Sequence, residues 1–391
     1  MEPSTRCVHG GRTPPAVFEP LVLPVVRSSI YRLGDETYRL RAAGRGPETR
    51  VYSRETNPTV EAVEARLAAL EGAERSLLFA SGQAALHSVL LAFLARGDRV
   101  LAARQLYGGS TSLLQNLVPR LGVALVELEF ADLAALRAAA DERTRLVLCE
   151  NVSNPLTAVA DVPAIAAIAH AQPRALLVVD ATLTSPIGQQ PLALGADLVF
   201  HSATEYLGGH SDLIGGLVSA RRELAEACWA WRARAGGCID PQVAWLIERG
   251  LKTLALRFFR QSASARQVAE FLAGHAEIEA VHYCGLPSHP DHEKATRLLA
   301  ACGGLLSAVV RGGDERALAV MRRLELFAEA ASLGGVESLV CRPSDMSHSY
   351  LTPAERAAMG IRPGLLRFAL GIEDASDLVA DLAQALAATR A

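Results

Sequence analysis

Lysine is almost absent from this chain. Of its 391 residues only Lys252 and Lys294 are lysines, and arginine supplies the rest of the 39 basic side chains. Few side chains can therefore provide the primary amine that covalent catalysis on carbonyl compounds requires. The formal net charge of −3 also argues against a surface that binds nucleic acid or an anionic membrane.

Long apolar runs, cysteine pairs and an export signal are missing as well. No uncharged apolar run approaches the ~18 residues that a membrane-spanning helix needs. The seven cysteines are scattered, odd in number and without a CxxC pair, which favours buried, reduced thiols over a disulfide framework. The N-terminal residues lack the apolar segment of a secretion signal. We therefore expect a cytoplasmic protein without a membrane or nucleic-acid partner.

What the chain does contain is an alternation of short apolar runs with alanine-rich amphipathic stretches between residues 76 and 220. Three of the runs are typical of buried parallel strands: 145–149, 175–180 and 197–200. The pattern predicts an α/β fold with a doubly wound, mostly parallel sheet. Ligands of such sheets bind at the carboxyl ends of the strands, which draws attention to Asp180, His201 and Ser202.

The composition divides the chain into three parts. Residues 1–58 are rich in proline, glycine and arginine and predict an extended N-terminal arm, held in place because its apolar side chains at 22–30 would be costly to leave in water. Residues 59–250 form the large domain, whose first helix Asn57 caps and Gly72 ends. Residues 251–391 contain the rest of a long helix, expected over roughly 241–273, and a smaller α+β domain.

Three features suggest a site for a flat, phosphorylated ligand. Ser81-Gly82-Gln83 begin a predicted helix, where backbone N–H groups favour an anion. Asp180 ends a strand too apolar for a free carboxylate, and Tyr107 precedes two glycines on a loop. Taken alone, a Ser-Gly pair at a helix start is usually only a helix cap, and a tyrosine of this kind is more often ordinary packing. For Asp180 alone, a helix N-cap and a partner for a cation are about equally compatible with the sequence.

Together these features belong to a set of segments that resembles the Cys/Met-metabolism family of pyridoxal-phosphate (PLP) enzymes, the transsulfuration lyases and synthases. The resemblance extends from about residue 5 to 385. It is strongest in eight places: 52–54 with 57–59, 79–85, 107–109, 150–155, 180–182, 200–212, 332–339 and 367–374. It implies fold type I, the aspartate-aminotransferase-like architecture of PLP enzymes, with PLP as the cofactor.

The resemblance assigns roles to individual residues. Tyr107 would stack on the cofactor and also take part in catalysis. The remaining cofactor-binding residues would be Tyr52, Arg54, Ser81, Gly82, Gln83, Asn154, Asp180, Thr182, Ser202 and Thr204. The substrate-binding residues would be Ser332, Leu333, Glu337 and Arg367, with Arg367 binding the substrate α-carboxylate. Because Tyr52 and Arg54 serve a neighbouring subunit's phosphate in the family, a homodimer or homotetramer is expected.

The segment Phe-His-Ser-Ala-Thr-Glu-Tyr-Leu-Gly-Gly-His-Ser-Asp at residues 200–212 departs from the family at one position. In the family, the residue between this threonine and tyrosine is the lysine that bonds PLP, and here it is Glu205. A carboxylate cannot form an imine, so PLP would be held non-covalently, or arrive as a substrate aldimine or as pyridoxamine phosphate. If burial raises its pKa, Glu205 is also a candidate general base.

Three functions are compatible with this substitution. The first is an atypical lyase or transferase that performs elimination or replacement on a sulfur-containing or activated amino acid, with Glu205 as the acid/base. The second is a non-catalytic PLP-binding or scaffold relative. The third is an engineered variant of an ordinary cystathionine γ-synthase or γ-lyase-like enzyme.

A cluster of histidines and one cysteine invites a metal interpretation. His282, Cys284, His289 and His292 lie close together in the sequence and are of the residue types that bind zinc. The family resemblance includes a similar stretch that binds no metal, so we expect no metal site here.

Overall fold

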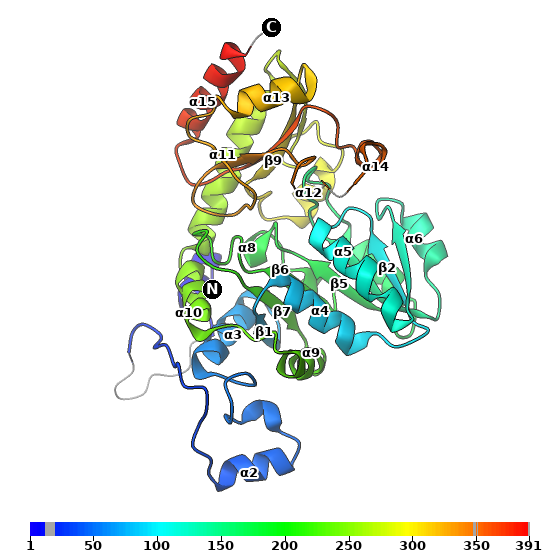
Figure 1. Cartoon of the computed structure of the whole chain (residues 1–391), viewed down its shortest axis with the longest axis vertical. Coiled ribbons are helices and arrows are strands. Elements are labelled where there is room, and N and C mark those ends of the chain that lie inside the picture. The colour runs from blue at the N-terminus through cyan, green and yellow to red at the C-terminus, as the bar shows by residue number, and fades with distance from the viewer. Residues whose placement is uncertain (12–19, 347–348, 350, 390–391) are drawn as a thin grey trace.

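The computed structural model describes residues 1–11, 20–346, 349 and 351–389. It contains a seven-stranded and a five-stranded sheet, each the centre of one domain, with a projecting N-terminal segment (Figure 1). Within the described residues no helix is both long and apolar enough to cross a membrane.

The large domain is built on the seven-stranded sheet, in the order β1-β7-β6-β5-β4-β2-β3. All neighbouring strands are parallel except β7, which runs antiparallel to β1 and β6. The strands are β1 (Arg75–Phe79), β2 (Arg99–Ala103), β3 (Ala124–Leu128), β4 (Thr144–Glu150), β5 (Leu176–Asp180), β6 (Leu198–Ser202) and β7 (Gly216–Ala220). The prediction of a mostly parallel α/β sheet is confirmed, and the three predicted strands correspond to β4, β5 and β6.

Helices pack on this sheet through apolar side chains. They are α3 (Pro58–Glu71), α4 (Gly82–Phe93), α5 (Gly108–Leu117), α6 (Leu133–Ala139), α7 (Val162–His170), α8 (Ser185–Gly188) and α9 (Arg222–Ala235), with 3₁₀ turns η2 (Pro119–Leu121) and η3 (Pro191–Leu194). Helix α3 begins and ends as its sequence predicts. The Asn57 side chain accepts hydrogen bonds from the amides of Thr59 and Val60, and Gly72 adopts a φ of 68° at the C-terminus.

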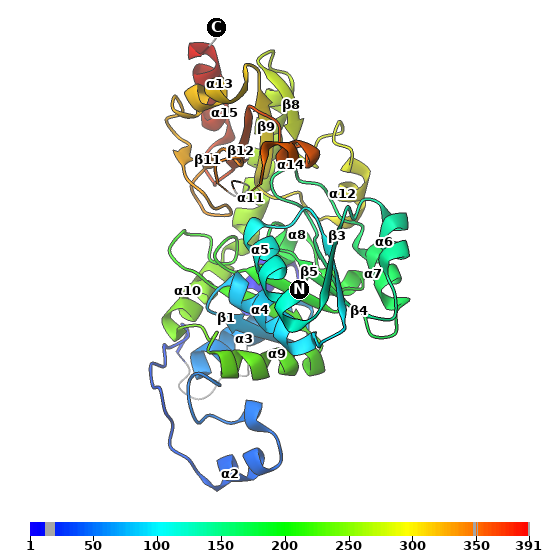
Figure 2. The ribbon, with the colours of Figure 1, turned by 45° about the vertical axis from the view of Figure 1, so that its right-hand side comes forward.

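The long helix expected over 241–273 is two helices, α10 (Pro241–Leu251) and α11 (Leu254–Ala273). The chain turns between them at Lys252 and Thr253, where Arg257 reaches back and donates to the carbonyl of Gly250 at 2.9 Å. Helix α11 then connects the large domain to the small one (Figure 2). Apolar periodicity continues through the turn, which explains why the sequence pattern did not reveal it.

The small domain contains a five-stranded sheet in the order β10-β11-β12-β9-β8. Its strands are β8 (Ile278–His282), β9 (Leu305–Val310), β10 (Ala328–Glu329), β11 (Leu339–Cys341) and β12 (Leu365–Ala369). Its helices are α12 (His292–Leu298), α13 (Gly313–Met321), α14 (Pro353–Ala358) and α15 (Ala375–Ala388). The predicted smaller α+β unit therefore exists.

The N-terminal segment differs from the extended arm that was predicted. Helix α1 (Pro3–His9) contacts α3 and α11 and buries Cys7, so it belongs to the body of the protein. The segment that contains α2 (Asp35–Ala42) and η1 (Gly46–Glu48) does project, and these two elements lie far from both sheets (Figures 1 and 2). The expected burial of the apolar side chains at 22–30 is incomplete within one chain: Ile30 remains 66% exposed and Val22 48%.

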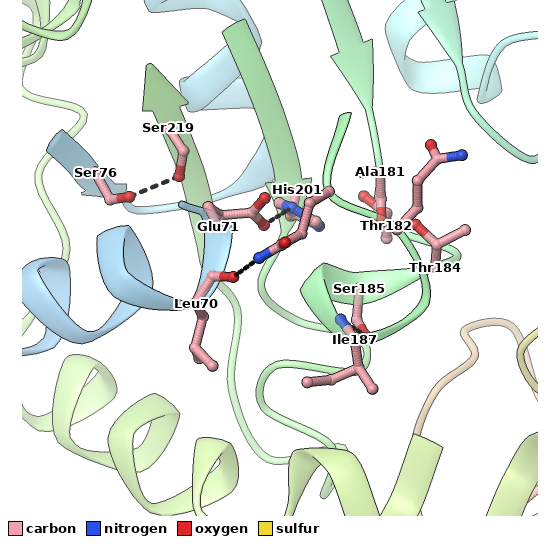
Figure 3. Close-up of polar contacts among 12 residues, drawn as sticks. Leu70, Glu71, Ser76, Ala181, Thr182, Thr184, Ser185, Ile187, His201 and Ser219 are labelled. Carbon is pink, nitrogen blue, oxygen red and sulfur yellow. Dashed lines mark hydrogen bonds and ion pairs between the residues drawn. The ribbon is translucent and has the colours of Figure 1, made fainter. Parts of the chain in front are cut away.

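A buried contact between a histidine and a glutamate joins the end of α3 to strand β6. His201 Nε2 contacts a carboxylate oxygen of Glu71, and the two side chains are 1% and 0% exposed (Figure 3). Nearby, the Ser76 and Ser219 hydroxyls share a hydrogen bond between β1 and β7. His201 therefore faces the α3 side of the sheet, whereas its neighbour Ser202 faces the cavity described next.

Candidate functional site

A cavity of about 530 Å³ lies where the parallel strands of the large sheet end and the small domain begins. Its floor includes Glu150, Asp180 and Ser202, the last residues of β4, β5 and β6. Ser332 and Arg367 of the small domain line the opposite side. The cavity therefore occupies the edge of the sheet at which α/β proteins bind their ligands.

One wall of the cavity is the N-terminus of α4. Ser81 caps this helix by accepting a hydrogen bond from the Ala84 amide at 3.1 Å. The amides of Gly82 and Gln83 form no hydrogen bond within the described part of the chain, and both residues line the cavity. A Cβ atom on Gly82 would lie 3.2 Å from Ser202 Cα, so glycine lets the helix start against β6. The wall is suited to an anion.

Asp180 is held at the end of β5 by Thr182. Its Oδ1 accepts hydrogen bonds from the Thr182 amide at 2.9 Å and the Thr182 hydroxyl at 2.5 Å. The same hydroxyl accepts one from the Ser202 amide at 2.8 Å, which joins the ends of β5 and β6. Burial raises the pKa of Asp180, against the lowering effect of Thr182 and the charge of His201.

Tyr107 lies at the start of α5, and the side chain of Glu150 holds its backbone in place. The Glu150 carboxylate accepts hydrogen bonds from the backbone amides of Tyr107 and Asn154. A Cβ on Gly109 would lie 2.5 Å from the Tyr107 ring, so the Tyr-Gly-Gly sequence allows the ring to fold over the first turn of the helix. Burial, and secondarily the nearby Asp180, raises the pKa of Glu150 well above its ordinary value.

Glu205 is anchored to the small domain through residues 332 and 333. Its Oε2 accepts hydrogen bonds from the Ser332 hydroxyl at 2.7 Å and the Leu333 amide at 3.2 Å. Burial raises the pKa of Glu205, although these two hydrogen bonds and the charge of Arg367 act in the opposite direction. The cavity therefore contains a carboxyl group that takes up a proton more readily than an exposed glutamate.

Arg367 supplies positive charge on the small-domain side. It is 4% exposed, and its Nη2 donates to the Ser332 carbonyl at 2.9 Å. Its Nε is buried without a hydrogen-bond partner among the described residues. A buried guanidinium whose donors are not all used is suited to bind a carboxylate ligand.

Comparison with known proteins identifies the family. The profile of the Cys/Met metabolism PLP-dependent enzymes matches residues 4–387. This chain belongs to that family.

Individual relatives and one solved structure match over nearly their whole length. The L-methionine gamma-lyase of Pseudomonas deceptionensis is 38% identical over 387 residues, which cover 98% of this chain and 97% of the relative. The cystathionine beta-lyase of Lactococcus lactis subsp. cremoris is 40% identical over 384 residues, 98% of both chains. The crystal structure of metB from Corynebacterium glutamicum superposes with a TM-score of 0.92 at 35% identity, covering 100% of this chain and 99% of that one. The architecture is therefore that of PLP fold type I.

The residues of the cavity fit the family's cofactor. The unpaired amides of α4 can receive a phosphate, and buried Asp180 can balance a protonated pyridine nitrogen. The side-chain oxygen of Asn154 is buried without a hydrogen-bond partner in the described structure, so this amide is available to a ligand. An anionic phosphate and a flat, protonated ring can thus be accommodated.

Most of the residues predicted from the sequence meet in this cavity. Its lining includes Ser81, Gly82, Gln83, Tyr107, Asn154, Asp180, Thr182, Ser202, Thr204, Glu205, Ser332, Leu333 and Arg367. Tyr52 and Arg54 lie instead on the projecting segment, with the Arg54 guanidinium 5.0 Å from the centre of the Tyr52 ring. Glu337 is exposed and is not part of the lining. The roles of all these residues remain predictions.

Sequence reasoning assigned no role to several other lining residues: Ser110, Glu150, Phe200, Ile214, Ala331 and Met346. Glu150 could have been found, because it ends β4 directly beside Asp180 in the sheet and the strand-end rule applies to it equally. The apolar residues carry no comparable signal, since they are indistinguishable in the sequence from other core residues.

The histidines near residue 290 are occupied by the backbone. His289 Nε2 contacts the Leu156 carbonyl at 3.2 Å, and His292 Nδ1 contacts the Cys284 carbonyl at 3.1 Å. Among the described residues no group of three or more His, Cys, Asp or Glu side chains is arranged to hold a metal ion.

The raised pKa of Glu205 has a consequence for stability. The folded protein binds this proton more tightly than the unfolded chain does, so ionisation of Glu205 destabilises the fold as the pH rises above about 4. We expect cofactor-free Glu205→Gln to have a Tm about 2 °C or more above that of the native protein at pH ~7. The difference should shrink as the pH falls toward and below ~4, where Glu205 becomes protonated in both the folded and the unfolded state.

Thermal unfolding at the two pH values tests this expectation. Exposed Glu223, replaced by glutamine, is the control and should shift Tm little at either pH. A Glu205→Gln protein less stable than the native one at pH ~7 would show that the contacts with Ser332 and Leu333 outweigh the cost of burying the charge.

Proposed function

We propose that this chain binds PLP without a covalent bond and acts on sulfur-containing amino acids, with Glu205 in the position of the family's PLP lysine. The observation that carries the proposal is the placement of Glu205 in the same cavity as Asp180 and Arg367. Neither lysine of the chain lines that cavity. Lys252 pairs with Glu248, and Lys294 with Asp291, at 3.3 and 2.6 Å.

Several side chains would hold the cofactor. The amides at the start of α4, with the hydroxyls of Ser202 and Thr204, would bind its phosphate. Asp180 would pair with the ring nitrogen, and Tyr107 would cover the ring. When bound, PLP supplies an electron sink for the carbon skeleton of an amino acid.

The substrate class follows from Arg367 and from the relatives. A buried guanidinium that donates to Ser332 and retains an unused Nε would bind the α-carboxylate of an amino acid. Two of the similar proteins are a methionine γ-lyase and a cystathionine β-lyase, whose substrates share a carbon–sulfur bond. Elimination or replacement at such a bond is therefore the proposed reaction, and the family match does not distinguish the β from the γ position.

Glu205 would provide the proton transfer. A carboxyl group whose pKa is raised by burial is partly protonated closer to neutral pH, so it can both remove a proton from Cα and return one. Its negative charge also favours a cationic amine beside it. We therefore expect pyridoxamine phosphate, which carries such an amine, to bind more tightly than PLP, whose aldehyde is neutral.

The projecting N-terminal segment supports assembly from identical chains. Ile30, Leu21 and Tyr52 are 66%, 82% and 41% exposed. Packing against a second copy of the chain would remove this apolar surface from water. We propose that Tyr52 and Arg54 reach the phosphate site of a neighbouring subunit in a homodimer or homotetramer.

One geometric feature favours the non-catalytic alternative. Glu205 Oε2 already has two hydrogen-bond donors, Ser332 and Leu333, so the carboxylate could serve to hold the two domains together. A PLP-binding relative without turnover would retain this contact.

Calorimetry and product analysis separate the two functions. Native protein is titrated with PLP and with pyridoxamine phosphate, and then incubated with PLP and L-methionine or cystathionine while thiol and 2-oxo acid are measured. Product formation that Glu205→Gln lowers by about 100-fold or more supports general acid/base catalysis. Binding without product identifies the non-catalytic relative. Failure to bind either cofactor form contradicts the proposal that the chain binds PLP. Tighter binding of PLP than of pyridoxamine phosphate contradicts the expected attraction between Glu205 and a cationic amine.

A further inference from the structure

A separate cavity of about 300 Å³ lies in the large domain beside helix α1. Its walls come from segments that are distant in the sequence: α1, the stretch from α8 to η3, and the end of α12 with the residues that follow it. No described residue lines both this cavity, called the α1 cavity below, and the candidate site. Its size is at the lower end of the range for small-molecule sites, roughly 300–1,000 Å³.

Most of the wall of the α1 cavity is apolar. The apolar lining includes Pro3, Leu70, Pro186, Ile187, Leu194 and Leu298. Figure 3 shows Leu70 at the end of α3 and Ile187 in α8. An aliphatic group that enters this space leaves water for an apolar surrounding, which is favourable.

One cation lies in this wall without a counter-ion. Arg6 lines the α1 cavity and is partly buried. Its Nη2 donates to the carbonyl of Met1 at 3.2 Å, and no carboxylate in the described part of the chain forms an ion pair with it. No aspartate or glutamate of the described residues lines the α1 cavity either. The charge of Arg6 therefore favours an anionic ligand.

Two glutamine side chains add hydrogen-bond donors. Gln189 Nε2 donates to the Leu298 carbonyl at 3.2 Å, and Gln190 Nε2 donates to the Leu70 carbonyl. Each side-chain amide has a second N–H, which no acceptor among the described residues receives. Both glutamines line the α1 cavity. Together with Arg6 they suit a carboxylate, whereas the rest of the wall suits a hydrocarbon chain.

Gln189 also connects the α1 cavity to the candidate site. Its Oε1 accepts a hydrogen bond from Asn151 Nδ2 at 2.8 Å, and both side chains are buried. The Asn151 backbone amide donates to the Asp180 carbonyl at 3.0 Å. Asn151 directly follows Glu150, which lines the candidate site as Asp180 does. A ligand that fixes Gln189 therefore acts on the ends of β4 and β5.

We propose that the α1 cavity is an effector site for a small aliphatic carboxylate, and that Gln189 and Asn151 transmit its occupancy to the ends of β4 and β5. The carboxylate would pair with Arg6, and the hydrocarbon chain would lie against Pro186 and Ile187. The effector site exists whether or not PLP binds, so it is tested on the cofactor-free protein.

Calorimetry with isocaproate tests the site. The full chain is titrated as native protein and as Arg367→Leu, because Arg367 offers a carboxylate a second partner in the candidate site. We expect Arg367→Leu to bind the probe, and the added Arg6→Met substitution to weaken binding about 10-fold or more, since a charge-assisted contact is lost. Isohexanol, the neutral alcohol analogue, should also bind about 10-fold more weakly. Arg266→Met removes an exposed arginine paired with Glu270 and should change little.

A second variant blocks the α1 cavity without changing its charge. Ala193 is an exposed residue of the wall, so Ala193→Trp should obstruct the cavity, leave the core intact and abolish binding. A probe that binds native protein but not Arg367→Leu occupies the candidate site, which overturns the proposal. Absence of binding overturns it too, as does binding that neither Arg6→Met nor Ala193→Trp weakens.

Hydrogen exchange tests the connection to the candidate site. Saturating isocaproate should slow backbone exchange of residues 149–152 several-fold in Arg367→Leu, and should have no effect there once Ala193→Trp is added. Residues 222–235 in α9 line neither cavity and provide the internal control. Binding of the probe without slower exchange at 149–152 overturns the proposed transmission through Gln189 and Asn151.

Discussion

Glu205→Lys will acquire a covalently bound PLP that the native protein does not hold. The new amine would sit in the cavity among Ser202, Thr204 and Asp180. Burial lowers the pKa of a lysine and leaves more of it in the nucleophilic, uncharged form. After incubation with PLP and reduction with sodium borohydride, mass spectrometry should find about one PLP group per chain at residue 205. Native protein should show almost none there.

The native chain provides the control for this experiment. Its Lys252 and Lys294 are both ion-paired outside the cavity, and reaction at either should be slow and equal in the two proteins. A PLP group at Lys252 or Lys294 of the native chain would show that the cofactor site lies elsewhere. If Glu205→Lys folds and binds PLP but its new amine stays unmodified, the side chain at this position does not point toward the cofactor.

Replacing Arg367 with leucine should weaken binding of a carboxylate substrate by at least 100-fold. Arg367 is the buried cation of the cavity, and loss of one partner from a buried charge pair typically costs 2–5 kcal/mol, which corresponds to roughly 30-fold to several thousand-fold. Calorimetry with L-methionine on the PLP-loaded protein measures the change. An amine that lacks the carboxylate, 3-(methylthio)propylamine, should bind native and Arg367→Leu proteins with similar affinity.

The fold should survive the Arg367→Leu substitution. The native guanidinium is buried with an unused Nε, so removing it also removes a desolvation cost. Arg260→Leu is the matched control, because that arginine is exposed and pairs with Asp374 away from the cavity. If Arg367→Leu weakens the amine as strongly as the amino acid, the arginine shapes the cavity and does not recognise the carboxylate.

The sequence predicted those parts of the structure that local rules decide. Asn57 and Gly72 mark the ends of α3 because capping depends on a few neighbouring residues. Asp180 was placed at the cavity because β5 is a continuous apolar run that ends in a carboxylate. The family resemblance then added Ser332 and Arg367, which lie more than 120 residues away from Glu205 in the sequence and meet it only through the packing of the two domains.

Features that depend on tertiary contacts were not predictable in this way. The turn between α10 and α11 follows from Arg257 binding the Gly250 carbonyl, which no periodicity reveals. Helix α1 packs on the body because its short apolar face meets α3 and α11.

Ser332 positions an acidic and a basic side chain of the cavity relative to each other. Its backbone has a φ of 100°, an unusual value for a residue other than glycine, and in this conformation its hydroxyl binds Glu205 while its carbonyl binds Arg367. One residue thus sets the spacing between an acidic and a basic group. A ligand that places its carboxylate at Arg367, its α-hydrogen at Glu205 and its amino group toward the bound cofactor would be held at three points. Three fixed points distinguish mirror images, so we expect the pocket to select one enantiomer of an amino acid.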